Sequence, residues 1–402
     1  MSKKISVGVA LALVLASIAA TFAITMAFSQ SIYNRLISNI SGRAEMYAAV
    51  DDINALIRSN YYFFGSINND NINRSIANGY IEGLGDPNSR LLTASEYIDY
   101  TNRLNGKASG VGITTAWNKA NKTLVVTSVA NGSSAATKGI KKDDVIVRIA
   151  GENVTAGNYA RLENTLSGDT LSTISVTCRR KDTELEFNVT VGYSYLSVSR
   201  KTTGSVGYVR ITDFYANTQE QLKEAVGALQ DSGVTALVFD LRGTSNGTVE
   251  YAAAAIDCIT PICSNQDEVL VKLVGRDGAA ILSYPSTSNN LNLPMAVLVN
   301  EKTAGPAELF ACDLRDFGKA ILVGEQTAGV GTAQQTFTLE DGSAVVLTTS
   351  KIIPYKSESF HDTGLKPDYI VALDADAAES PDLLREKEDK QLLKALSVLT
   401  AQ

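Results

Sequence analysis

The sequence contains a single histidine, His361, among its 402 residues. A zinc site of the HExxH type needs two histidines, so the sequence excludes that site and every histidine-rich metal cluster. A serine or cysteine hydrolase that depends on histidine would have to use His361, which lies in the polar stretch 357–363 and is predicted to be a solvated loop residue. We therefore expect any hydrolase activity to work without histidine, and we expect no metal and no other cofactor.

Cysteine and positive charge are also scarce. The four cysteines form no CxxC pair and are too few for a disulfide framework. Buried free thiols are favoured over a bond between Cys258 and Cys263, and the other two cysteines are Cys178 and Cys312. Lys and Arg total 36 against 43 Asp and Glu, a net charge of −7, so we expect no nucleic acid partner.

One long hydrophobic run stands at the N-terminus. Residues 5–28 carry no charge and, as a helix, reach about 36 Å, enough to cross a hydrocarbon core of ~30 Å. The run is longer than the ~7–15 apolar residues of a cleaved signal peptide, which stays the alternative. We predict a retained transmembrane helix, and Lys3 and Lys4 before it predict a cytoplasmic N-terminus with the rest of the chain outside.

Two segments of different texture follow the predicted anchor. Residues 29–105 read as a connector and an N-terminal helical segment, with a helix from Met46 to Arg58 and a helical stretch over 70–103 that is interrupted at Gly85–Asn88. Residues 106–193 are rich in short β runs and predict a small β module. Its expected strands are Leu124–Val129, Val145–Ala150, Ile174–Cys178 and Leu185–Val191.

Strands and helices alternate over residues 194–378, which predicts an α/β core with a mostly parallel sheet. The expected strands are Val206–Ile211, Ala236–Asp240, Met295–Val299 and Ala320–Val323. Helices are expected from Thr218, with Gln221 completing a capping box and Gly233 at the end, over 248–258, and from Pro306. In the last domain, residues 379–402, the stretch Asp382–Leu399 predicts a solvated, amphipathic C-terminal helix.

Five short blocks in this order resemble the carboxyl-terminal (tail-specific) processing peptidases, a family with a PDZ domain. The blocks are Leu84–Thr93 (LGDPNSRLLT), Ser109–Ile113 (SGVGI), Lys142–Gly151, Phe239–Arg242 (FDLR) and Gly364–Asp368 (GLKPD). They extend over nearly all of the chain beyond residue 50. The resemblance implies a serine nucleophile at a helix start and a lysine base 25 residues later, a pair that needs no histidine.

Neither catalytic side chain stands at the matching positions. The nucleophile motif reads Thr303–Glu308 (TAGPAE), which places Gly305 at the serine position. The base motif reads Thr327–Gln334 (TAGVGTAQ), which places Val330 at the lysine position, 25 residues on, and keeps only Gln334 of the catalytic set. By itself, TAGPAE is a good helix start, with proline first and an acid in the first turn.

The resemblance also implies an oxyanion hole that this chain lacks in part. One donor is expected to be the backbone N–H of the residue after the nucleophile, and here that residue is Pro306, which has no N–H. The other side comes from the loop after FDLR, Gly243–Gly247, which keeps only part of the family's glycine-rich pattern. Gly247 is the position in that loop expected to belong to the site.

A displaced group is the alternative route to catalysis. Cys312 lies two turns into its helix and is expected to pack in the core, and no lysine partner is identifiable for Thr303 or Ser343. Lys302 and Lys319 are expected to be hydrated and protonated.

The β module keeps a binding loop in this comparison. In PDZ domains, the loop before the second strand offers backbone N–H groups to the carboxylate of a peptide C-terminus. Gly110, Val111, Gly112 and Ile113 fit that loop, although they also fit an ordinary glycine-rich strand start.

The leading hypothesis is a membrane-anchored, extracytoplasmic protein of the bacterial cell envelope with this peptidase fold and no proteolytic activity. It would bind peptide or protein C-termini as a scaffold or regulator, possible partners including an active relative. The alternatives are an active serine-type endopeptidase with a displaced catalytic group and a purely structural envelope protein.

Overall fold

The structure is a computed structural model that describes residues 26, 47–108, 110–130, 132–168, 171–192, 194–261, 269–287, 291–374, 384 and 386–400. The chain divides into two compact units, Met1–Ile76 and Ala77–Gln402. Apart from Met26, the predicted anchor at 5–28 lies outside the described residues. Within the described part of the chain, no helix has the length and apolar character needed to cross a membrane.

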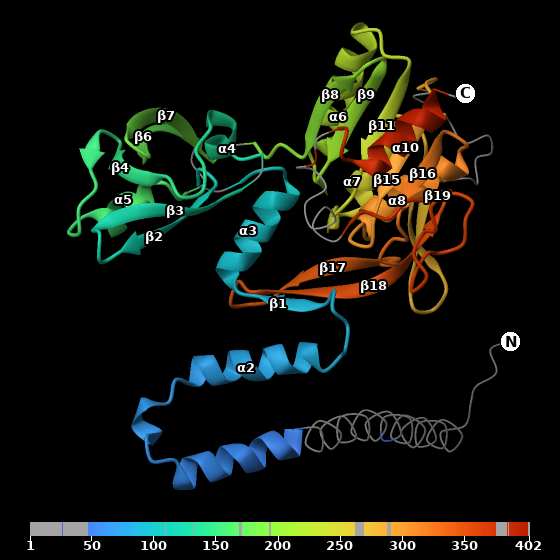
Figure 1. Ribbon diagram of the computed structural model, residues 1–402. Coiled ribbons are helices and arrows are strands. Elements are labelled where there is room, and N and C mark those ends of the chain that lie inside the picture. Colours follow the sequence, from blue (N-terminus) through green and yellow to red (C-terminus); the bar gives the residue numbers. More distant parts are fainter. Residues whose placement is uncertain are drawn as a thin grey trace, which may run out of the picture. The chain divides into compact units, whose positions relative to one another are not determined.

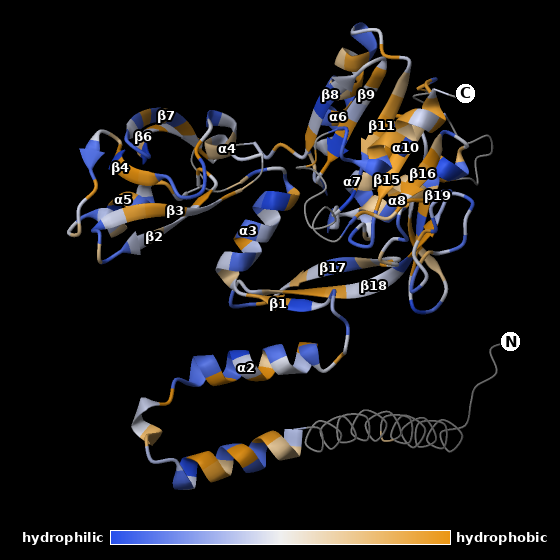
Figure 2. Ribbon diagram, viewed as in Figure 1, coloured by the Kyte–Doolittle hydropathy of each residue, from blue (hydrophilic) through white to orange (hydrophobic). Residues whose placement is uncertain are grey.

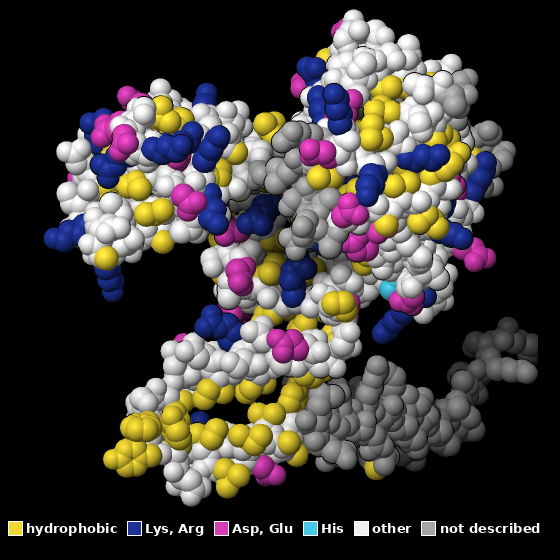
Figure 3. Space-filling model, in the orientation of Figure 1, with side chains coloured by type: hydrophobic (Ala, Val, Ile, Leu, Met, Phe, Trp, Pro, Cys, Tyr) yellow, Lys and Arg dark blue, Asp and Glu magenta, His cyan; other side chains and the backbone are white. Residues whose placement is uncertain are grey.

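The N-terminal part of the described chain is helical. Residues 47–60 form a helix, as predicted, and η1 (Phe64–Ser66) and α2 (Asn69–Glu82) follow. The aromatic residues 61–64 follow the helix 47–60 and reach the start of η1. They are exposed, and Figure 3 shows hydrophobic side chains gathered over this segment. This part of the chain has no buried residue in η1 or α2, so it contributes no core of its own.

Strand β1 (Arg90–Leu92) and helix α3 (Ala94–Leu104) come next. The prediction of one helical stretch over 70–103 missed β1, which pairs with a strand more than 250 residues later in the chain. Helix α3 begins with a complete capping box: Thr93 Oγ1 accepts from Glu96 N, and the Glu96 carboxylate accepts from Thr93 N.

The small β module follows, and its four predicted strands are confirmed (Figure 1). Its strands are β2 (Ile113–Asn118), β3 (Thr123–Val129), β4 (Val145–Ile149), β5 (Glu152–Asn153), β6 (Ser172–Arg180) and β7 (Thr183–Val191). Its helices are α4 (Ser134–Lys138) and α5 (Tyr159–Thr165). The antiparallel sheet has the order β2-β3-β4-β6-β7. Alternate residues such as Leu124 and Val126 point into a separate core.

The predicted α/β core is confirmed as a six-stranded sheet in the order β19-β16-β15-β11-β9-β8. All neighbours are parallel except β8 and β9. The strands are β8 (Val198–Thr203), β9 (Val206–Ile211), β11 (Ala236–Asp240), β15 (Met295–Val299), β16 (Ala320–Gly324) and β19 (Tyr369–Ile370). Strands β11 and β15 are buried at every position, because helices cover both faces of the sheet (Figure 2).

The two faces have different helices. Alternate residues such as Leu237 and Phe239 pack with α6 (Thr218–Asp231), α7 (Val249–Asp257) and α8 (Pro306–Asp316). The residues between them, including Val238 and Leu298, pack with α10 (Lys390–Leu399). The sheet is therefore the middle layer, and the starts of α7 and α8 lie at the carboxyl ends of its central strands.

A second, antiparallel sheet was not predicted. It has the order β1-β18-β13-β14, and β17 also pairs with β18. Its other strands are β13 (Val271–Val274), β14 (Ala280–Tyr284), β17 (Thr332–Thr338) and β18 (Ala344–Pro354). A short parallel pair joins β10 (Asp213–Phe214) to β12 (Asn246–Gly247).

Two local predictions are wrong. The capping box at Thr218 and Gln221 does not form: Asn217 is the cap residue, and the Gln221 side chain instead accepts from Ser197 N and Val198 N. The C-terminal helix is amphipathic but not solvated, because its apolar face, including Leu392, lies on the sheet. In both cases a contact with a distant part of the chain determines where the side chains lie, and the local sequence pattern does not indicate that contact.

Candidate functional site

The structure brings the two catalytic positions together. Gly305 is the cap residue of α8, with φ 57° and ψ −115°, and Pro306 is the first residue of the helix, as the sequence predicts. A Cβ atom added at Gly305 would have the carbonyl oxygen of Val330 as its nearest neighbour, at 3.9 Å. Positions 305 and 330 therefore face each other, and the space where a side chain at 305 would begin is open.

The side chain of Glu308 fixes the backbone at both positions. Its carboxyl group is fully buried and accepts from the N–H groups of Gly305 at 3.0 Å, Gly329 at 2.7 Å and Val330 at 2.8 Å. The hydroxyl of Thr327 also donates to it. Burial raises the pKa of Glu308, although these hydrogen bonds oppose the rise. The sequence predicted an acid at the helix start, but only the fold could show that it also fixes the backbone at position 330.

Two adjoining cavities make a groove over these positions. One, of about 340 Å³, is lined by Gly305, Pro306 and Val330, and the other, of about 420 Å³, extends along β14 and β17. They share five lining residues: Tyr100, Gly247, Pro306, Thr332 and Gln334. The predicted site residues Gly247, Gly305, Pro306, Val330 and Gln334 therefore all line one groove.

The groove has hydroxyl groups but no amine or imidazole beside them. Among the residues that the structure describes, neither cavity is lined by a lysine, a histidine or a cysteine, and Glu250 is the one acidic lining residue. The amide nitrogen of Gln334 lies 3.3 Å from the hydroxyls of Thr332 and Thr348, and no lysine takes part in these contacts. The described part of the groove therefore holds no amine or imidazole that could accept the proton of a threonine or serine hydroxyl, as the serine–lysine chemistry of the resemblance requires.

The donors expected at an oxyanion hole are reduced. Pro306 supplies no N–H, and the N–H of Gly305 is already bonded to Glu308. On the opposite side, Gly247 has φ 120°, and a Cβ there would lie 2.2 Å from the carbonyl oxygen of Phe214, so only glycine fits. Gly247 thus lines the groove in a conformation that requires glycine.

A buried ion-pair network supports the loop 243–247. Arg242 is fully buried, and its guanidinium bonds Asp240 and, across the sheet layer, Asp389 and Gln391 at the start of α10. Burial would raise the pKa of Asp240, but Arg242 and Arg210 hold it below its ordinary value. The C-terminal helix therefore fixes one wall of the groove from behind.

The groups considered for displaced catalysis all lie elsewhere. Burial raises the pKa of Cys312 to about 12, so this thiol keeps its proton. Thr303 is buried and donates to the carbonyl of Leu241, and Ser343 closes a turn with Asp341. Cys178 is buried and free, and Cys258 is free and half-buried, whereas Cys263 lies outside the described residues.

The basic candidates do not reach the groove either. Lys302 is exposed, and Lys319 donates to the carbonyl of Leu291. His361 is half-buried rather than solvated, because its backbone packs against Gly331. It lines neither cavity, so it is not placed to act as a base on the groove's hydroxyl groups.

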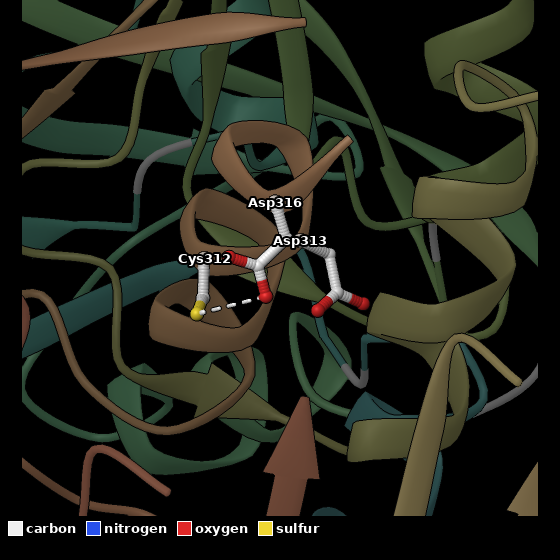
Figure 4. A group of neighbouring side chains, drawn as sticks. All are labelled: Cys312, Asp313 and Asp316. Atoms are coloured by element: carbon white, nitrogen blue, oxygen red, sulfur yellow. Dashed lines mark hydrogen bonds between the residues drawn. The ribbon is translucent and has the colours of Figure 1, made fainter. Parts of the chain in front are cut away.

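Cys312, Asp313 and Asp316 form a cluster whose ligand atoms lie within 4.8 Å of one another (Figure 4). Both oxygens of Asp316 already accept hydrogen bonds from the segment 356–357, and one Asp313 oxygen accepts from Tyr355 N. Burial raises the pKa of Asp313 well above its ordinary value. These groups therefore fasten the segment 355–357 to α8, and a thiol that keeps its proton is a poor metal ligand.

The loop predicted to bind a peptide carboxylate has the expected glycines but already uses two of its donors. Gly110 N donates to the carbonyl of Gly168 at 2.7 Å, and Val111 N donates to that of Leu166 at 3.0 Å. Gly112 has φ 86°, and Ile113 begins β2. A carboxylate that used the N–H of Val111 would first have to replace the Leu166 carbonyl.

Two side-chain contacts also close the space between strand β2 and helix α5. The rings of Trp117 and Tyr159 stack with centroids 4.3 Å apart, and the Thr115 hydroxyl donates to Glu163. Strand β2 is the end strand of its sheet, so a peptide that added a strand there would have to enter between β2 and α5. The module's own side chains occupy that space.

Comparison with known families finds a match for the α/β core and another for the small β module. Residues 205–371 match Peptidase family S41, and residues 109–191 match the PDZ domain. The first match contains both substituted motifs, and the second contains the whole loop 109–113.

The chain is similar to bacterial proteins named "Probable CtpA-like serine protease". It is 27% identical over 325 residues to the one from Staphylococcus aureus (strain MRSA252), an alignment that covers 80% of this chain and 64% of the relative. The protein of that name from Staphylococcus haemolyticus (strain JCSC1435) is 28% identical over 322 residues, covering 77% of this chain and 64% of the relative. The chain thus matches less than two thirds of the length of these relatives.

Among solved structures, the photosystem II D1 C-terminal processing protease is 24% identical. The superposition covers 73% of this chain and 80% of that one, with a TM-score of 0.44.

Proposed function

Since the chain belongs to peptidase family S41 and carries a PDZ domain, we propose that it is a non-catalytic member of the family that binds peptide or protein tails. One observation carries the proposal. Gly305, Pro306 and Val330 stand together at the serine, oxyanion and lysine positions, in a groove whose described lining residues include no lysine, histidine or cysteine. A groove of this kind can hold an extended peptide, but it has no pair of groups that could activate a nucleophile.

The proposal includes a location. The uncharged stretch 5–28, with Lys3 and Lys4 before it, supports a protein held in the membrane with its S41 and PDZ parts outside the cytoplasm. Possible partners in that setting are exported proteins with accessible C-termini and an active relative of the same family.

The absence of catalysis is tested with the full-length chain, purified in detergent and incubated with casein as an unstructured substrate. We expect no cleavage above a buffer control and no labelling by fluorophosphonate or iodoacetamide probes at a residue of the groove. An active peptidase with a displaced group would instead turn over casein and carry the label on one residue. Such a result would overturn the proposal.

Peptide binding by the PDZ domain is expected to require opening between β2 and α5. Replacing Trp117→Ala removes the stack on Tyr159, which contributes ~0.5–1.5 kcal/mol to the closed form, so C-terminal peptides should bind roughly 2–10-fold more tightly. Trp117→Phe keeps an aromatic partner for Tyr159 and should change binding little. Retention of a random heptapeptide pool with free C-termini, quantified by mass spectrometry, measures the effect.

The opposite result has a clear meaning. If Trp117→Ala weakens retention while circular dichroism shows a folded protein, Trp117 belongs to the binding surface rather than to its closure. If blocking the peptide carboxylates leaves retention unchanged, the loop 110–113 is not a carboxylate site. If no variant retains any peptide, the result contradicts peptide binding and favours a purely structural protein.

A further inference from the structure

We propose that the groove over Gly305 selects peptides that carry a carboxylate, which it binds with Arg90 and Arg103. The carboxylate is either an Asp or Glu side chain or the peptide's own C-terminus. This inference rests on the proposed function, since it names the chemistry of the ligand that the same groove would hold.

The charge of the groove supports this choice. Among the described residues, the cavity of about 340 Å³ is lined by Arg90 and Arg103 and by no acidic residue, and the adjoining cavity adds one carboxylate, Glu250. Asp213 lies behind the wall, where it is 4% exposed and accepts a hydrogen bond from Asn246, a lining residue. The positive charges therefore face the cavity without an acid beside them in its lining, and a ligand that enters meets a site of net positive charge.

Both arginines stand on rigid elements. Arg90 lies on β1, in register with Val346 of β18, and its guanidinium lies over the ring of Tyr100 at 5.3 Å from the centroid. Tyr100 itself lines both cavities, so this stacking holds the Arg90 guanidinium beside the groove.

Arg103 is fixed by the two ends of its helix. It lies in the last turn of α3, a helix that begins with the Thr93 capping box. Beyond it, the Leu104 carbonyl accepts from Ala216 N at 2.9 Å, which ties the end of α3 to the chain beside Tyr215. The backbone positions of both charges are thus set before a ligand arrives, which lowers the entropy lost on binding.

The adjoining cavity adds a second requirement. It is lined by apolar side chains of the second sheet, namely Leu273, Ile281, Leu282 and Tyr284. Ile281 and Leu282 are 55% and 46% exposed, so a ligand can still cover them. Guanidinium groups bind carboxylates through two parallel hydrogen bonds, and apolar surface favours apolar side chains. The best ligand is therefore a peptide with a carboxylate next to a run of apolar residues.

The test uses one fluorescein-labelled heptapeptide, rich in Leu, Ile and Phe, in four forms. The forms combine Asp or Asn within the peptide with a free or an amidated C-terminus. Fluorescence anisotropy with the full-length chain is expected to show about tenfold tighter binding for a form with a carboxylate than for the neutral form. The two carboxylate sources are separated by which of the singly charged forms shows the preference.

The arginine variants locate the preference. Arg90→Gln and Arg103→Gln should each reduce the tenfold difference between the carboxylate and neutral forms, and the double variant should abolish it. Arg276→Gln, in the turn between β13 and β14 and outside both cavity linings, is the matched control and should keep the preference. Raising the salt concentration should also shrink the difference, because salt screens exposed charges.

Each other outcome overturns a defined statement. Equal binding of all four forms overturns the selection of carboxylates but leaves the groove as a peptide site. A preference that survives in the double arginine variant belongs to another part of the chain, such as the PDZ loop, and overturns the assignment to Arg90 and Arg103. A lack of binding by any form overturns the proposed function itself.

Discussion

The double variant Gly305→Ser/Val330→Lys is expected to cleave casein no faster than about a hundredth of the rate reached when an oxyanion donor is also restored. Pro306 supplies no N–H at the position next to the new serine, and loss of one oxyanion donor costs about 10²–10³ in rate. Adding Pro306→Ala to the double variant returns that N–H. The triple variant is therefore expected to be about 10²–10³ times faster than the double variant.

The local geometry is suited to this experiment. A serine Cβ at 305 has no atom nearer than the Val330 carbonyl at 3.9 Å, and the backbone already has the positive φ of a sharp turn into a helix. That φ costs a non-glycine residue ~1–3 kcal/mol, which the hydrogen bonds to Glu308 help to offset. Initial cleavage rates of labelled casein at matched protein concentration give the comparison.

Two controls isolate the chemistry. Pro306→Ala alone has no nucleophile and should be inactive, and the triple variant with Val330→Met in place of Val330→Lys should lack the base. Fast cleavage by the double variant with Pro306 in place would show that the N–H of residue 306 is not an oxyanion donor in this fold. Equal rates for the Met and Lys forms would show that position 330 is not the base position.

Breaking the network around Arg242 is expected to have the largest effect on stability. Asp389→Ala would remove a partner that lies 2.8 Å from the Arg242 guanidinium, and Arg242→Ala would leave Asp240 and Asp389 buried without it. Removing one member of a buried ion pair typically costs ~3–5 kcal/mol when the remaining charge is left without compensation, as Asp389 is in Arg242→Ala. In Asp389→Ala, Arg242 keeps Asp240 at 2.6 Å, so that variant should lose less. Urea unfolding followed by circular dichroism at pH 7 measures the loss.

The next residue in the chain provides the control. Lys390 pairs with Asp374 at 3.0 Å, but both side chains are largely exposed, so Lys390→Ala should cost less than ~1 kcal/mol. A loss below ~1 kcal/mol for Asp389→Ala would mean that α10 is not fixed through Arg242. The Asp389→Ala variant should also bind peptides more weakly, since the loop 243–247 at the groove depends on the same arginine.

The parallel sheet was predictable because its strands are buried on both faces. Met295–Val299 is a continuous apolar run, Val206–Ile211 and Ala236–Asp240 contain one charged residue each, and the structure has strands with the same bounds. The antiparallel sheet was harder to see. Strand β18 mixes polar and apolar residues, and its partner β1 lies far away in the sequence, so no local pattern announces the pairing.

The two wrong local predictions, at the start of α6 and at α10, have the same cause: side chains contact parts of the chain that are distant in sequence. Gln221 had the right spacing for a cap, but Ser197 and Val198 offer it two N–H groups that the helix start does not. The face of α10 could be predicted from its period, whereas what covers it could not.

The candidate site shows the same division. The positions 305 and 330 came from matching motifs, and no physical feature of a 25-residue separation requires them to meet. Arg90 stands in the block Leu84–Thr93 but gave no sign of a role at the site, and Arg103 gave no sequence signal, because an exposed arginine is ordinary until a fold places two of them at one cavity.

The buried carboxyl group of Glu308 makes the backbone of the groove independent of the side chains at positions 305 and 330. The turn at 305 and the backbone at 330 are held by one carboxyl group that belongs to neither position. Side chains at 305 and 330 can therefore change without dismantling the pocket. Substitutions at positions 305, 306 and 330 should therefore change the chemistry of the groove while the backbone that forms it stays in place.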